Sequence, residues 1–162
     1  MSDYQIRPNC MAVGEKDDEL SALAVSSGIA VCLYDELHRV GGMTYTLFPD
    51  SGGDPEGGGR NKLKYVDTSL DELLSRLLER GASCEGMSAK IIGGAKIFHF
   101  SGNFGDGNLG RRNVEAAREW LKKKNIPIRA EDTGDNFGRT VRFRLADGKV
   151  EIESVSKYQY CI

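Results

Sequence analysis

The sequence contains no apolar run that approaches the ~20 residues needed to span a bilayer. It also lacks an export signal, because Met1-Ser2-Asp3-Tyr4 has neither a basic start nor an apolar stretch. We therefore expect a cytoplasmic protein without membrane insertion. An excess of one charge is missing too, since 22 basic and 24 acidic side chains give a formal net charge of -2 and are evenly scattered. No basic face is predicted, which disfavours nucleic acid and anionic lipid as partners.

The chain has only four cysteines, and they are far apart, so none forms the CxxC pair that is typical of a structural metal site. A reducing compartment also argues against disulfide bonds. We therefore expect no metal and no cofactor, and we interpret most of the cysteines as small buried hydrophobic residues. They are Cys10, Cys32, Cys84 and Cys161.

Length and composition predict one domain over residues 1–162. A chain of 162 residues with 40% hydrophobic content is long enough for a single core, and two domains are not expected. A glycine-rich segment at about 50–60 follows Pro49. We interpret it as a flexible surface loop and not as a domain linker, since the chain before it is too short to form a core alone. The sequence has no internal repeat.

Short apolar or alternating runs rich in β-formers predict strands. One of them breaks at Gly93-Gly94 and then resumes, and two others are joined by Asp147-Gly148, a hairpin signal. The runs are 11–13, 29–33, 40–48, 89–98, 128–131, 141–145 and 149–155.

Two segments have the spacing of amphipathic helices. In the first, five leucines recur at helical intervals over 70–78, with Thr68 as the expected N-cap and Gly81 as the expected stop. The second runs over about 111–124 and is followed by Asn125, which suits a left-handed cap. The sum is an α/β chain in which strands outnumber helices.

Five blocks of sequence occur in order between about residues 11 and 152. They are Val31-Cys32-Leu33-Tyr34-Asp35, Gly41-Gly42-Met43, Tyr65-Val66-Asp67-Thr68, Ile92-Gly93-Gly94-Ala95-Lys96-Ile97-Phe98, and Gly110-Arg111-Arg112-Asn113-Val114 continuing through Ile126-Pro127 and Ala130-Glu131-Asp132 to Gly138-Arg139. Each block alone is a common local sequence, but the ordered series of five blocks is specific enough to indicate a family. In this series the chain resembles the CheD family of chemoreceptor glutamine deamidases.

The resemblance implies an α/β fold with a β-sandwich-like core of mostly antiparallel strands flanked by helices. It implies a reaction, the hydrolysis of particular glutamine side chains on methyl-accepting chemoreceptors to glutamate and ammonia. It also implies a second partner, the CheC phosphatase, which binds members of the family and competes with receptors.

The family resemblance also implies where catalytic residues belong. The family uses a cysteine nucleophile just before the Val-Cys-Leu-Tyr-Asp strand, a histidine base two residues after Gly-Gly-Met, and an orienting threonine six residues before the cysteine. In this chain those positions hold Gly28, Tyr45 and Ala22. Neither Gly28 nor Ala22 has a reactive side chain, and a phenol with an ordinary pKa of about 10 is a poor base at neutral pH. Because such residues act as a unit, we predict no useful deamidation.

Three hypotheses follow. The first is an inactive family member that binds chemoreceptors, a CheC-type phosphatase or an active paralogue. The second is an active glutamine deamidase with a relocated nucleophile, either Cys32 or Ser27, although Cys32 is also interpreted as a buried core thiol. The third is an unrelated hydrolase on the same scaffold. Neither histidine is a strong candidate base, since we interpret His38 as a solvated loop residue and His99 as structural.

Candidate binding residues come from blocks that the family places near the mouth of its active site. Lys96 and Arg111 are equally well interpreted as solvated surface residues, whereas an exposed Phe98 or Phe100 would be a natural anchor for a partner. The candidate binding residues are Gly93, Gly94, Lys96, Phe98, Phe100, Arg111 and Asn113.

Overall fold

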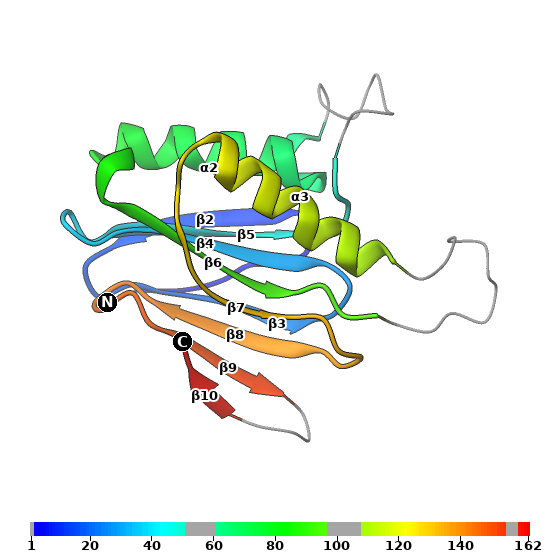
Figure 1. Ribbon diagram of the computed structural model, residues 1–162. Helices are drawn as coiled ribbons and strands as arrows, with labels where there is room; N and C mark the ends of the chain where they lie inside the picture. Colours follow the sequence, from blue (N-terminus) through cyan, green and yellow to red (C-terminus); the bar gives the residue numbers. More distant parts are fainter. Residues whose placement is uncertain (1, 51–60, 97–107, 155–158) are drawn as a thin grey trace.

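The computed structural model describes residues 2–50, 61–96, 108–154 and 159–162. These residues form a three-layer α/β sandwich, in which two five-stranded sheets pack face to face and two α-helices cover the outer face of one sheet (Figure 1). We call the sheet beneath the helices the inner sheet and the other one the outer sheet. The predicted α/β class and the sandwich that the family resemblance implied are confirmed.

The inner sheet has the strand order β2-β5-β4-β6-β7, and the outer sheet has the order β1-β3-β8-β9-β10. Neighbours pair antiparallel except for β6–β7 and β1–β3, which pair parallel. The bounds are β1 Asp3–Gln5, β2 Cys10–Glu15, β3 Glu19–Val25, β4 Ile29–Asp35, β5 Val40–Thr46, η1 Lys62–Lys64, α2 Val66–Glu79, η2 Cys84–Gly86, β6 Met87–Gly93, α3 Leu109–Lys123, β7 Ile128–Thr133, β8 Arg139–Arg144, β9 Val150–Ser154 and β10 Gln159–Cys161.

β4 is buried along its whole length because it lies at the centre of the inner sheet with a hydrophobic core on each face. Successive side chains of a strand point to opposite faces. Odd-numbered residues from 29 to 33 therefore pack under the helices, and even-numbered residues from 30 to 34 face the outer sheet. This is why the segment is a nearly continuous apolar run in the sequence.

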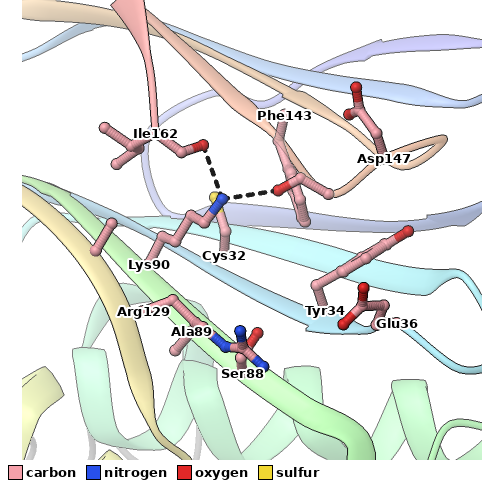
Figure 2. A pocket seen from close by; sticks show the side chains of 12 residues that line it. Cys32, Tyr34, Glu36, Ser88, Ala89, Lys90, Arg129, Phe143, Asp147 and Ile162 are labelled. Carbon is pink, nitrogen blue, oxygen red and sulfur yellow. Dashed lines mark hydrogen bonds between the residues drawn. The ribbon is translucent and has the colours of Figure 1, made fainter.

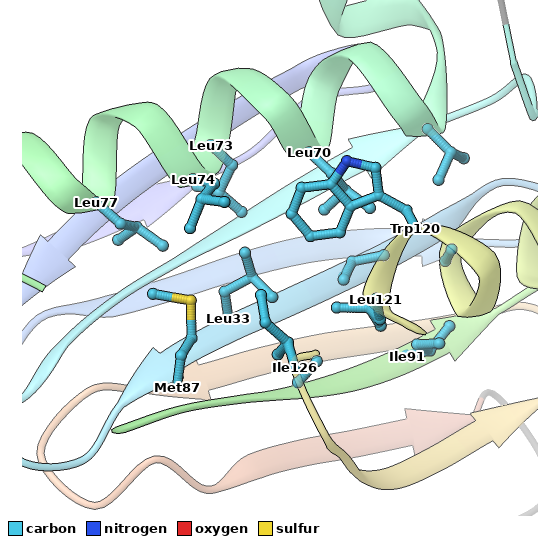
Figure 3. Close-up of a cluster of buried hydrophobic side chains, with 14 of the residues drawn as sticks. Leu33, Leu70, Leu73, Leu74, Leu77, Met87, Ile91, Trp120, Leu121 and Ile126 are labelled. Atoms are coloured by element: carbon cyan, nitrogen blue, oxygen red, sulfur yellow. The ribbon is translucent and has the colours of Figure 1, made fainter. Parts of the chain in front are cut away.

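The two helices close the first of these cores. Leu73 and Leu77 of α2 and Trp120 of α3 point toward the inner sheet, where Leu33 of β4 meets them (Figure 3). Trp120 also joins the helices, because its indole Nε1 donates a hydrogen bond to Oδ1 of Asp71 at 2.8 Å. The helix layer thus fixes the position of α3, whose first turns border the site described below.

Both predicted helices are present, with one error at an end. The first helix begins at Val66, so Thr68 lies in its first turn and is not the N-cap; its hydroxyl donates to the carbonyl oxygen of Lys62. Gly81, at φ +95°, follows the end of the helix as expected, and Asn125 adopts the left-handed conformation at φ +58°. Among the described residues, no helix is long and apolar enough to cross a membrane.

The predicted strands are also present, but three strands of the outer sheet were missed: β1, β3 and β10. β3 contains a bulge between Ala22 and Val25 that interrupts its alternation, and β1 and β10 are exposed three-residue strands. The break at Gly93 is confirmed, whereas the resumed strand at 97–98 and almost all of the glycine-rich segment at 50–60 lie outside the described residues.

Candidate functional site

The three implied catalytic positions lie at one end of the sandwich. Ala22 is in β3 of the outer sheet, Tyr45 is in β5 of the inner sheet, and Gly28 immediately precedes β4. The Tyr45 hydroxyl donates to the carbonyl oxygen of Ala24 at 3.4 Å and so links β5 to β3 next to Ala22. Gly28 in turn packs against the carbonyl oxygen of Thr46, which adjoins Tyr45. The three positions therefore belong to one cluster in space.

Gly28 has no side chain, and its surroundings leave no room for one. A Cβ atom built on Gly28 would lie 2.6 Å from the backbone oxygen of Thr46 and 2.8 Å from Cδ2 of Leu47. Carbon–oxygen contacts this short do not occur without a shift of one partner, and here the partner is a backbone atom in a paired strand. The position that the family resemblance implies for a nucleophile therefore has neither a side chain nor room for one.

Tyr45 and Ala22 are both buried in the core between the two sheets. Burial raises the pKa of Tyr45 above its ordinary value, so the phenol stays protonated at neutral pH and cannot accept a proton from a nucleophile. Ala22 is fully buried opposite Val141 of β8 and offers no group that could orient a base. The ring and the methyl group fill this region with apolar atoms.

The segment 26–28 is held in place from both sides. The backbone nitrogen of Gly94 donates to the carbonyl oxygen of Gly28 at 2.9 Å. Nδ2 of Asn113, a fully buried residue of α3, donates to the carbonyl oxygen of Ser27 at 2.9 Å and to a second backbone oxygen just after β5 at 3.0 Å. Asn113 was predicted as a binding residue, and in the structure its amide ties helix α3 to the segment before β4.

Gly93 and Gly94 also lie where the backbone runs too close to its neighbours for a side chain. Both have positive φ, at +113° and +68°. A Cβ on Gly93 would lie 2.5 Å from the carbonyl oxygen of Gly28, and a Cβ on Gly94 would collide with Val114 of α3. These predicted binding residues therefore have a packing reason to be glycine.

Lys96 and Arg111 border a separate cleft of about 340 Å³ between the first turns of α3 and the loop after β7. Nε of Arg111 lies 3.0 Å from Oε1 of Glu115, and both side chains are more than half exposed. The backbone nitrogen of Lys96 donates to the carbonyl oxygen of Asp135 at 2.8 Å. The two cations thus share one surface next to the segment 26–28. Phe98, His99 and Phe100 lie outside the described residues.

The candidate replacement nucleophiles, Cys32 and Ser27, lie in β4 and just before it. Cys32 is 2% exposed, and burial raises the pKa of its thiol, an effect that the charge of Lys90 opposes only in part. His38 lies beyond the far end of β4 from Ser27, and its Nδ1 is 2.7 Å from Oδ2 of the fully buried Asp35. His38 is an exposed turn residue, as interpreted from the sequence, and its ring also braces a buried carboxylate.

A buried ion pair beside this site was not predicted from the sequence, although both residues belong to the blocks that carry the family resemblance. Arg139 of β8 is fully buried, and its Nε lies 3.2 Å from Oδ1 of Asp132 in β7. Its Nη1 also donates to the carbonyl oxygen of Gly134 at 3.1 Å. Because Arg139 pairs with Val25 of β3, the ion pair connects the two sheets directly beneath the segment 26–28.

Fold and site together define a class: a three-layer α/β sandwich with a candidate centre where the two sheets and α3 meet. The family model for CheD, described as chemotactic sensory transduction, matches residues 47–154, and the chain belongs to the CheD family. The matched range begins after Tyr45, so it contains none of the three implied catalytic positions.

Relatives of the chain support this assignment over nearly its full length. The chain is 41% identical to the probable chemoreceptor glutamine deamidase CheD of Lachnoclostridium phytofermentans, over 92% of this chain and 91% of that protein. It is 41% identical to the protein of the same description from Thermococcus kodakarensis, with coverage of 90% and 88%. It is 38% identical to the chemoreceptor glutamine deamidase CheD of Thermotoga maritima, with coverage of 89% and 87%.

Proposed function

We propose that this member of the CheD family acts in chemotactic adaptation by binding and not by deamidation. Its partners in this proposal are chemoreceptors, a CheC-type phosphatase or an active paralogue in the same cytoplasm. The observation that carries the proposal is the absence of both the nucleophile and the space for it at Gly28, where a Cβ would meet the Thr46 backbone oxygen at 2.6 Å. Tyr45 and Ala22 support it, since neither supplies a base or an orienting group.

The retained surroundings of the altered centre support the binding half of the proposal. The segment 26–28 is fixed by Gly94 and Asn113, and the ion pair of Arg139 with Asp132 underlies it. These contacts give the surface above the three implied catalytic positions a defined shape. Receptors are the natural partners, because the relatives named above are described as chemoreceptor glutamine deamidases. Lys96 and Arg111 are the charged groups that we expect such a partner to contact.

Mass spectrometry of a receptor cytoplasmic fragment tests the catalytic half. After incubation with the purified protein, target peptides that contain glutamine should keep their mass, and no ammonia should be released. Turnover that disappears in the Cys32→Ala or Ser27→Ala variant would instead establish the alternative, a glutamine deamidase with a relocated nucleophile.

Calorimetry tests the binding half separately. We expect at least micromolar affinity, about 8 kcal/mol, for a receptor fragment or a CheC-type phosphatase. Arg111→Glu should weaken the association several-fold by reversing a charge at the cleft, whereas Arg80→Glu, an exposed arginine after α2, should leave it unchanged. Absence of heat with every chemotaxis protein of the host would contradict the proposal.

A further inference from the structure

A second cavity, of about 270 Å³, opens between the two sheets near the turn that joins β8 to β9. It lies along the later half of β4, away from Gly28. Its floor is formed by the rings of Phe143 and Tyr34 and by the thiol of Cys32, and Lys90, Ser88 and Arg129 reach it from β6 and β7 (Figure 2). The cavity therefore combines an apolar floor with a polar margin, which is the usual composition of a small-molecule site.

The polar residues on β6 stand where a sandwich normally places apolar ones. β6 is an internal strand between β4 and β7, and its residues facing the outer sheet are Ser88, Lys90 and Ile92. Inward positions of packed sheets are expected to be apolar, as Ile92 is. Ser88 and Lys90 depart from this rule, and both line the cavity.

Lys90 places a cation at the centre of the cavity. Its Nζ donates to the carbonyl oxygens of Gly148 at 3.0 Å and Ile162 at 2.7 Å (Figure 2). An ammonium group has three N–H donors, so one remains beyond these two contacts with described residues. Burial lowers the pKa of Lys90, because a partly buried ammonium group loses part of its hydration.

A β-bulge brings a second cation to the same cavity. Ala89 pairs with Ile128 and Lys90 pairs with Ala130, so Arg129 is the extra residue of β7. As a result, the consecutive residues Arg129 and Ala130 both line the cavity, which regular alternation would prevent.

The cavity also carries an acid that has no other role in the described parts of the chain. Glu36 lines it and forms no hydrogen bond or ion pair with any described residue, and the same holds for Arg129. Asp147 is different, because its carboxylate accepts from the backbone nitrogen of Lys149 at 3.0 Å and lies 3.6 Å from Nη2 of Arg144. Glu36 and Arg129 are therefore the uncommitted charges, of opposite sign, on one cavity.

We propose that this cavity binds a small zwitterion, a free α-amino acid. Its carboxylate would accept hydrogen bonds from the remaining N–H of Lys90 and from the guanidinium of Arg129, and its ammonium group would face Glu36. The side chain would lie over Phe143 and Tyr34. Both cations and the acid must be matched at once, so a simple anion or a simple amine satisfies only half of the site.

Nuclear magnetic resonance with ¹⁵N-labelled protein tests the proposal. Titration with L-alanine, L-leucine and L-glutamine should give saturable shifts of the amides of Ser88, Lys90 and Gly148 for at least one of them, whereas sodium acetate and ethylamine hydrochloride should give none. Arg129→Gln and Glu36→Gln should each weaken binding by about tenfold or more, as expected for a hydrogen bond to a charged group. Both residues are exposed, so these variants should fold.

Arg112→Gln is the matched control, since Arg112 is an exposed arginine of α3 outside the cavity, and it should bind like the parent protein. Three results would overturn the proposal: no saturable shift with any of the three amino acids, equal saturation by acetate, or unchanged binding in Arg129→Gln. None of them bears on Gly28 or on receptor binding, because the cavity lies on a different part of the sandwich.

Discussion

Replacing Gly28 by alanine isolates the steric argument on which the proposed loss of catalysis depends. The added Cβ would meet the backbone oxygen of Thr46 at 2.6 Å. That oxygen belongs to β5, which is hydrogen-bonded to β4 and cannot retreat without disturbing the ladder. Overpacking of this kind typically costs 1–3 kcal/mol, so we expect the free energy of unfolding to fall by about that amount.

Gly138→Ala is the matched control for this change. Its added Cβ would lie 3.1 Å from Oγ of Ser26, a side-chain atom that can rotate away, and the position has no positive φ. Glycine-to-alanine changes at compatible positions stabilise the folded state by about 0.4–1 kcal/mol, because they restrict the unfolded chain. The tight contact with Ser26 opposes this gain, so Gly138→Ala should be close to neutral in stability.

Urea denaturation, with unchanged slope m for both variants, measures the difference. A Gly28→Ala variant as stable as Gly138→Ala would refute the reasoning, because the nucleophile position would then have room. The combined variant Ala22→Thr, Gly28→Cys and Tyr45→His addresses the same point chemically. We expect weak but measurable glutamine deamidation from it, because the Cβ atom of the new cysteine must displace the Thr46 oxygen. We expect none from any single change, because the three groups act as a unit.

Three further predictions concern the scaffold. Arg139→Leu, which breaks the buried ion pair with Asp132, should lower the free energy of unfolding by about 3–5 kcal/mol in urea denaturation, and a loss below 1 kcal/mol would contradict a structural role for the pair. Although burial alone would raise the pKa of Asp35, hydrogen bonds from the Ser83 backbone and from His38 outweigh it and lower the pKa. The stability that Asp35 contributes is therefore present above its unfolded pKa of about 4 and is lost as the pH falls through its lower folded pKa. The difference in urea midpoint between the parent and Asp35→Asn should shrink in that pH range. In thiol labelling of the native protein, Cys32 should react far more slowly than the three exposed cysteines, and equal rates would revive it as a nucleophile.

Local sequence signals predicted most of the elements. The leucines at 70–78 gave α2 because helical spacing places them on one face, and Asn125 marked the end of α3 because its backbone must turn left-handed. The same signals failed in the outer sheet. β3 is bulged between Ala22 and Val25, and β1 and β10 hold no buried face of their own, so no alternation reveals them.

The sequence by itself determined the family and the α/β class and predicted the three implied catalytic positions, since these depend on residue types and their order along the chain. Only the tertiary structure decided what surrounds them. The oxygen that closes Gly28 comes from β5, the amide that holds Ser27 comes from α3, and the partner of Arg139 comes from the opposite sheet. The cavity around Lys90 likewise depends on a bulge in β7 and on a turn of the outer sheet. Such contacts join residues far apart in the chain, and the register and packing that create them leave no local mark in the sequence.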